Sequence, residues 1–117
     1  MSEREVLLLV EDMLDATNKI FTYTKGLSYE QFISDNKTID ATVRNFEIIG
    51  EAANRIPNDF KFTHPEIEWR RIIGLRNRII HEYFGIDYLI VWDKRAFFTR
   101  VGGVAKHSIA EQRIDLQ

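Results

Sequence analysis

The chain carries its most chemically capable side chains in the run Arg76-Asn77-Arg78-Ile79-Ile80-His81-Glu82-Tyr83. Arginine supplies a fixed positive charge, histidine titrates near neutrality, and tyrosine supplies a phenol. Read as a helix, the run brings these three groups within about two turns of one another. Together they have the chemistry to bind and cleave a phosphodiester. Because most helical arginines and histidines are structural, the elements around this run must decide what it does.

Apolar residues recur every three or four positions, a period that predicts helices and no strands. The first helix is expected over residues 2–25, where Ser2 and Glu5 form a capping-box pattern. Ser28 and Gln31 repeat that pattern and predict a short second helix that extends to residue 33. A second long helix is expected over roughly 38–56, where Pro57 stops it, and a polar loop follows over 57–64. A third long helix is capped by Thr63 or His64 and ends near Gly85. A further helix is capped by Asp87 and runs through Trp92.

This pattern predicts an all-α fold, an antiparallel bundle of four or five helices joined by short loops. The helix over 38–56 carries three small residues, Gly50, Ala52 and Ala53. Small side chains allow another backbone to come close, either from the same chain or from a second copy of it.

Helical geometry places Arg76 on the apolar side of the helix that contains the run, here called the motif helix. At about 100° per residue, five side chains fall within roughly 60° of Trp69: Ile72, Ile73, Arg76, Ile80 and Tyr83. Asn77 and His81 share a neighbouring face about 80–120° away. Arg71 and Arg78 point to the opposite side and are expected to be solvated.

A lone charge within an apolar stripe is unfavourable unless it is paired or faces a wet cleft. One interpretation of Arg76 is an ion pair with Glu47 or Glu51 of the preceding helix. The other is a cleft, at a subunit interface for example, in which Arg76 awaits an anionic ligand. His81 taken alone is most simply a half-buried histidine that binds a carbonyl, and Tyr83 taken alone is most simply a core residue.

The combination of these residues favours a functional site, because Asn77 is placed to orient the imidazole while Arg76 supplies charge. One feature of the geometry complicates this hypothesis. On an ideal helix Arg76 and His81 are about 140° apart, so they do not share a face. Either the arginine side chain curls round the helix, or the same helix of a second copy completes the site. We favour the second copy.

Composition excludes several classes of protein. A chain of 117 residues is long enough for one domain with a core. Its net charge of −2 gives no global attraction for nucleic acid, although residues 94–117 carry five Lys/Arg against two Asp/Glu. The chain has no cysteine, which excludes disulfides and thiolate metal sites and fits a cytoplasmic protein. His64 and His107 are isolated from carboxylate clusters, so no metal site is predicted.

The spacing Arg76-x4-His81-x-Tyr83 resembles the signature of HEPN-domain proteins, and specifically of the HepT toxins of prokaryotic toxin–antitoxin pairs. The whole run from Trp69 to Asp87 is much more specific than the spacing. The segment Ile48-Ile49-Gly50-Glu51-Ala52-Ala53 on the preceding helix also looks like that family. The resemblance covers roughly residues 3–93, so we take residues 1–93 as a HEPN-like helical domain.

The resemblance implies an all-helical homodimer whose two motif helices line a shared cleft. It also implies a metal-independent endoribonuclease, the toxin of a type VII-like toxin–antitoxin system, without a cofactor. The implied partner is a small nucleotidyltransferase antitoxin of the MNT type, which modifies the motif tyrosine, here Tyr83, with AMP. Neither the resemblance nor the early apolar run Val6–Val10 indicates a membrane protein.

Residues 94–117 depart from the family pattern. Family members continue with a long amphipathic last helix, whereas Val101-Gly102-Gly103-Val104 is a poor helix interior. This C-terminal segment is therefore expected to be partly irregular.

The hypothesis from the sequence is that a ribose 2′-hydroxyl attacks the adjacent phosphate of RNA. In this hypothesis His81 transfers the proton and Arg76 stabilises the transition state, while Asn77 and Tyr83 position the reacting groups. The alternative is a non-catalytic helical module in which Arg76 and His81 hold a nucleotide or a protein partner.

Overall fold

The computed structural model describes the backbone of residues 1–81 and 88–116, with the side chains of residues 1–79 and 88–108. Over these ranges the chain forms α-helices and no strand, which confirms the all-α fold class. The helices are α1 (Glu3–Thr24), α2 (Tyr29–Ile33), α3 (Asn36–Arg55), α4 (Asn58–Thr63), α5 (Trp69–His81) and α6 (Tyr88–Leu116).

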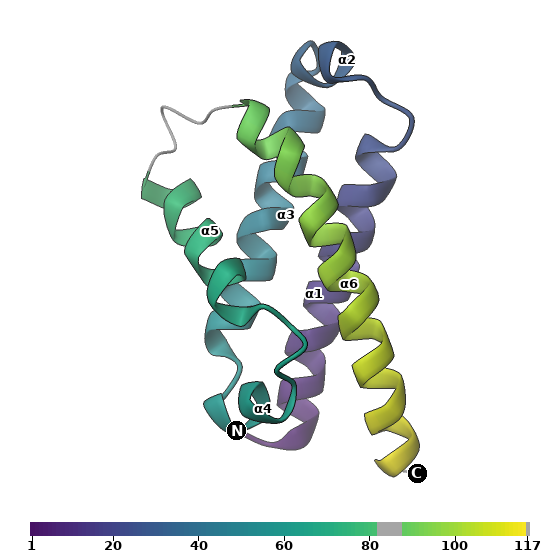
Figure 1. Cartoon of the computed structure of the whole chain (residues 1–117), viewed down its shortest axis with the longest axis vertical. Coiled ribbons are helices and arrows are strands. Elements are labelled where there is room, and N and C mark those ends of the chain that lie inside the picture. Colours follow the sequence, from purple (N-terminus) through teal and green to yellow (C-terminus); the bar gives the residue numbers. More distant parts are fainter. Residues whose placement is uncertain (82–87, 117) are drawn as a thin grey trace.

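The long helices α1, α3 and α6 lie side by side along the longest axis of the molecule (Figure 1). Along the chain, α1 and α5 run in one direction and α3 and α6 run in the other, so the two chain ends lie at the same end of the bundle (Figure 1). The short helix α2 covers the other end, and α5 packs chiefly against α3. The predicted antiparallel arrangement is therefore present. None of the described helices is long and apolar enough to cross a membrane.

Helix starts follow the predicted capping chemistry. Ser2 accepts a hydrogen bond from the Glu5 amide at 3.2 Å, and the Glu5 carboxylate accepts one from the Ser2 amide at 3.0 Å. Ser28 and Gln31 form the same reciprocal pair at the start of α2. These bonds satisfy amide groups that a helix start leaves unpaired. The start of α3 lies two residues before the predicted position, because Asp35 caps it by accepting hydrogen bonds from the Thr38 amide and hydroxyl.

The segment between α3 and α5 differs from the prediction. Residues 58–63 form α4 rather than a polar loop, and α5 begins at Trp69 rather than after Thr63 or His64. The physical reason is the burial of Ile67, which is 3% exposed and draws this segment onto the core. The indole of Trp69 donates a hydrogen bond to the His64 carbonyl at 3.0 Å, which closes a turn where a straight helix was expected.

The expectation of a partly irregular C-terminal segment is wrong over the described residues, because α6 is one helix from Tyr88 to Leu116. Gly102 lies where α6 meets α1, and a β-carbon added to it would lie 2.3 Å from the Thr17 hydroxyl oxygen. The poor helix propensity of this glycine is thus offset by close helix packing. Ser108 further ties α6 to the α4–α5 connection, because its hydroxyl donates a 2.6 Å hydrogen bond to Glu66 and lowers the pKa of that carboxyl group.

The core is continuous through the bundle. Phe46 of α3 stacks on Phe98 of α6 with ring centroids 4.4 Å apart, and both side chains are almost fully buried. Phe32 of α2 packs 5.2 Å from the Trp92 ring of α6, which closes one end of the core. Ile72 of α5 is also fully buried, so the motif helix is anchored to the bundle through its apolar side.

The two adjacent glycines of α6 should respond oppositely to alanine. Gly102→Ala is expected to destabilise the protein by about 1–3 kcal/mol, because the new methyl group overpacks the contact with Thr17. Gly103 is exposed and a β-carbon there meets nothing within 4 Å, so Gly103→Ala should stabilise α6 by about 0.5–1 kcal/mol. Urea unfolding of the two variants beside the wild type measures both changes. Stabilisation by Gly102→Ala would contradict the close α1–α6 packing.

Candidate active site

The motif helix α5 crosses α3 at Gly50. A β-carbon added to Gly50 would lie 2.1 Å from the β-carbon of Arg76 and 2.4 Å from its γ-carbon. No larger residue fits there unless the two helices move apart. The small residue noted in the sequence therefore accommodates a helix of the same chain, and the residue seated on it is the motif arginine.

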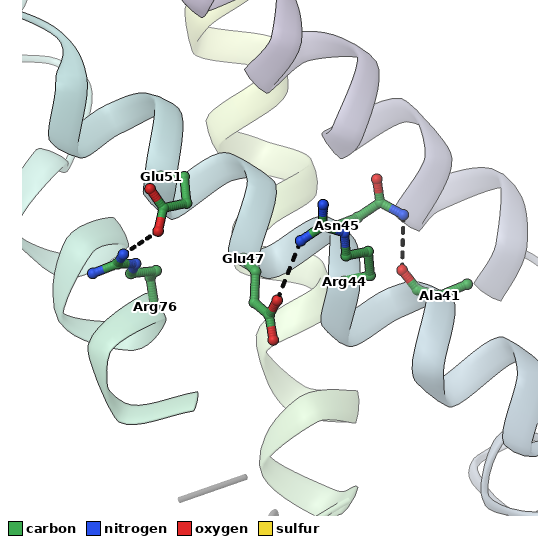
Figure 2. A network of polar contacts seen from close by, with 6 residues as sticks. All are labelled: Ala41, Arg44, Asn45, Glu47, Glu51 and Arg76. Atoms are coloured by element: carbon green, nitrogen blue, oxygen red, sulfur yellow. Dashed lines mark hydrogen bonds and ion pairs between the residues drawn. The ribbon is translucent and has the colours of Figure 1, made fainter. Parts of the chain in front are cut away.

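Arg76 forms an ion pair with Glu51, which is adjacent to Gly50 on α3 (Figure 2). The pair joins Nη2 of the arginine to Oε1 of the carboxylate. Nη1 of the same guanidinium donates a 2.9 Å hydrogen bond to Oδ1 of Asn77. Both terminal nitrogens are thus held, one by the facing helix and one by the next residue of α5.

The other acid considered for this role has a different partner. Glu47 pairs with Arg44 one turn away on α3, at 3.5 Å (Figure 2). Of the two interpretations of Arg76, the ion pair is present, and Glu51 rather than Glu47 is its partner. The placement of Arg76 on the inner side of α5 follows the predicted helical geometry, beside the buried Ile72 and Trp69.

The pairing leaves the guanidinium partly accessible. The Arg76 side chain is 21% exposed and that of Glu51 is 49% exposed, so the pair lies at the edge of the α3–α5 interface rather than inside the core. Arginine has five N–H donors. Nη1 and Nη2 each use one in the contacts above, and the buried Nε has no acceptor among the described residues. Among the described residues, one further N–H on each terminal nitrogen has no acceptor and is available to an anion.

A shallow groove lies on the other side of Glu51, between α1 and α3. Its lining combines three apolar side chains with two acids and two arginines: Leu9, Ile48, Ala52, Asp12, Glu51, Arg44 and Arg55. Arg76 does not line this groove. Glu51 is therefore the residue that borders both the groove and the motif arginine.

Only some of the predicted site residues lie within the described part of the chain. Asn77 is exposed and its Oδ1 accepts a hydrogen bond from Arg76, while its role in orienting the imidazole stays a prediction. His81 is the last residue of α5, and its side chain lies outside the described part of the chain, as does the whole of Tyr83. Since α5 is one unbroken helix, positions 76 and 81 remain about 140° apart, as in the ideal geometry.

Two further residues of the region were not identified from the sequence as parts of a site. Gly50 was noted as a small residue, Glu51 as one of two possible ion-pair partners, and both as part of a segment that resembles the family. The sequence signal that could have identified them is that they are adjacent. A glycine lets an arginine of the facing helix approach the backbone, and the acid that follows it forms an ion pair with that arginine. Arg71, expected to be solvated, is exposed and also stacks on Phe97 of α6, with its guanidinium carbon 4.2 Å from the ring centroid. Within the described ranges no three histidine or acidic side chains gather in a way that could hold a metal ion.

Comparison with known proteins shows the family to which this chain belongs. Residues 13–94 match the family model described as ribonuclease HepT-like. The probable ribonuclease HepT of Thermococcus cleftensis is 46% identical over 83 residues, which are 71% of this chain and 76% of that protein. Several other relatives carry the name "Putative RNase". One of them, from Methanocaldococcus jannaschii, is 42% identical over 92 residues, covering 79% of this chain and 84% of its own length.

Another relative named "Putative RNase", from Caldanaerobacter subterraneus, is 39% identical over 84 residues, covering 72% of this chain and 75% of its own length. No solved structure matches the chain. The matched region contains α3 and α5, and so contains Gly50, Glu51 and Arg76 together with their contacts. The chain belongs to the HepT-like ribonuclease family of HEPN proteins.

Proposed function

We propose that this protein is a metal-independent endoribonuclease that cleaves RNA by attack of a ribose 2′-hydroxyl on the adjacent phosphate. The observation that carries the proposal is the placement of Arg76. In a chain of this ribonuclease family, its guanidinium is held at two nitrogens and remains partly exposed, on the same helix as His81. Arg76 shares the inner side of α5 with the buried Trp69 and Ile72, and an apolar residue in its place would avoid the cost of desolvating a charge.

Each site residue has a role in the proposed reaction. His81 acts as general base or acid, since an unperturbed imidazole has a pKa of about 6.5 and transfers protons near neutrality. Arg76 stabilises the additional negative charge on the phosphorane-like transition state and stays protonated throughout. Asn77, which accepts a hydrogen bond from Arg76, holds this cation in place. Tyr83 positions the RNA backbone.

The geometry of α5 favours a site built from two copies of the chain. Positions 76 and 81 lie about 140° apart around the axis of one helix, so one copy is not expected to direct both residues toward a single phosphate. In a homodimer whose motif helices face one another, Arg76 of one copy and His81 of the partner meet across the shared cleft. Two copies also supply the two proton-transfer groups that this reaction uses.

The biological role proposed for this activity is that of the toxin of a type VII-like toxin–antitoxin system in the cytoplasm. Cleavage of cellular RNA arrests growth, so such an enzyme requires a partner that silences it. The proposed partner is an MNT-type nucleotidyltransferase that transfers AMP to the Tyr83 phenol. Membership in the HepT-like family supports this role.

A second candidate function is a non-catalytic helical module that binds a nucleotide or a protein partner. Two observations favour it: Glu51 partly neutralises Arg76, and the whole chain carries a net charge of −2. RNA-binding proteins usually present a basic surface instead. Growth arrest on expression, abolished by Arg76→Ala, would separate the nuclease from the binding module.

The nuclease proposal predicts large losses of activity in two variants. His81→Ala should lower the cleavage rate by roughly a hundredfold or more, because the proton-transfer group is lost. Arg76→Ala should lower it by about 10²–10³-fold, because the transition-state charge loses a donor. The measurement is cleavage of a fluorescent RNA oligonucleotide by purified protein in excess EDTA.

Matched controls for this assay are His107→Ala and Arg70→Ala, which remove an exposed histidine of α6 and an exposed arginine of α5. Both should cleave at the wild-type rate. Wild-type cleavage by His81→Ala would refute the mechanism, and loss of wild-type activity in EDTA would replace it with a metal-dependent one.

Silencing by AMP predicts a covalent change at Tyr83. Co-expression with an MNT-type nucleotidyltransferase should add one or more AMP units, each of which contributes bulk and negative charge near the cation that binds RNA. Intact mass spectrometry detects the added mass, and the modified protein should lose cleavage activity. The control is Tyr88→Phe, which removes an exposed phenol at the start of α6 and should leave the modification intact. Modification of a Tyr83→Phe variant would refute this site.

A further inference from the structure

We propose that Glu51 is a positioning residue of the active site: it fixes the orientation of the Arg76 guanidinium toward the scissile phosphate and moderates the affinity of the site for RNA. This inference rests on the proposed ribonuclease activity. It assigns a role to a residue that lies on α3, outside the Arg76–Tyr83 run.

Helix packing fixes the path of the Arg76 side chain. Gly50 lets the β- and γ-carbons of Arg76 lie directly against the α3 backbone. The side chain is therefore fixed at its base by helix packing, and its end arrives beside the residue that follows Gly50. Glu51 meets it there through an ion pair to Nη2.

Two contacts set the direction of the guanidinium plane. Glu51 holds Nη2 from α3, and Asn77 holds Nη1 from α5 at 2.9 Å. Contacts at two nitrogens of a rigid planar group fix its orientation, whereas one contact leaves it free to rotate. An arginine fixed in this way loses less rotamer freedom when RNA binds, and its remaining donors are aimed before the reaction.

A contribution to folding stability alone does not explain the ion pair between Glu51 and Arg76. Ion pairs between partly exposed side chains contribute little to folding, and Glu51 is 49% exposed. The arrangement also buries Nε of Arg76 without an acceptor among the described residues, which is unfavourable. An apolar residue at this crossing would avoid that cost. The retained charge is better explained by its use on an anion.

Glu51 also has an opposing effect, because its carboxylate brings negative charge close to the bound phosphate. It should therefore weaken RNA binding while it improves the geometry of the reaction. A positioning residue of this kind affects KM and kcat in different ways, and a residue that only stabilises the fold does not produce that difference.

The test compares Glu51→Ala with Glu51→Gln in RNA cleavage. Alanine removes both the contact and the charge, so kcat should fall by at least tenfold and KM should also fall. Glutamine keeps an oxygen that accepts from Nη2 but removes the charge, so kcat should stay within about threefold of wild type while KM falls severalfold. Thermal unfolding of each variant should remain close to that of the wild type.

The matched control is Glu47→Ala, which removes an acid one turn away on α3 that pairs with Arg44 and does not contact Arg76. Its kcat should equal that of the wild type. The proposal is overturned if Glu51→Ala keeps a wild-type kcat, if Glu51→Gln loses as much activity as Glu51→Ala, or if Glu47→Ala loses as much.

A second measurement separates this inference from the proposed activity. In ¹⁵N-arginine NMR spectra, the Arg76 guanidinium should rotate slowly in the wild type and in Glu51→Gln, and rapidly in Glu51→Ala. Equal rotation in all three would overturn the positioning role whether or not RNA is cleaved. Conversely, if Arg76→Ala cleaves RNA at the wild-type rate, the proposed function is refuted. The NMR result would still show whether Glu51 restrains the Arg76 guanidinium.

Discussion

The crossing of α3 and α5 at Gly50 is the contact on which the site depends. Because α5 packs chiefly on α3, the rotation and height of the motif helix are set by this one interface. Glycine allows the Arg76 stem to reach the α3 backbone, and Ile72, one turn earlier, is fully buried in the same interface. A change in the spacing of these helices would move the arginine relative to Glu51, and with it the direction in which the cation points.

Much of the fold follows from local sequence signals. Reciprocal hydrogen bonds at Ser2 and Ser28, together with the apolar stripes of α1 and α3, are properties of neighbouring residues and could be predicted. The segment between α3 and α5 could not. Its turn depends on Ile67 entering a core formed by distant helices. The same limit applies to α6, whose Gly102 is stabilised in the helix by contact with Thr17 of α1.

The site was predictable in outline because helical periodicity assigns residues to faces. It placed Arg76 on the inner side of α5, where an ion pair with Glu47 or Glu51 was one of two interpretations. Residues four apart on a helix share a face, so only the height at which α5 crosses α3 decides between these two acids. That height is a tertiary property set at Gly50. The contact between Asn77 and Arg76 was not predicted either, because adjacent residues of a helix rarely face one another.

An acid beside the arginine of a proposed nuclease is consistent with catalysis when ground and transition states are compared. The bound RNA phosphate carries one negative charge, and a phosphorane-like transition state carries more. A cation whose charge is partly offset by Glu51 binds the ground state weakly, and the additional charge that develops during reaction still meets fixed N–H donors. Because repulsion from the Glu51 carboxylate also grows as this charge develops, Glu51 favours the rate only through the orientation that it gives to the Arg76 donors. The net charge of −2 also weakens RNA binding, because it limits nonspecific attraction of nucleic acid to the rest of the surface.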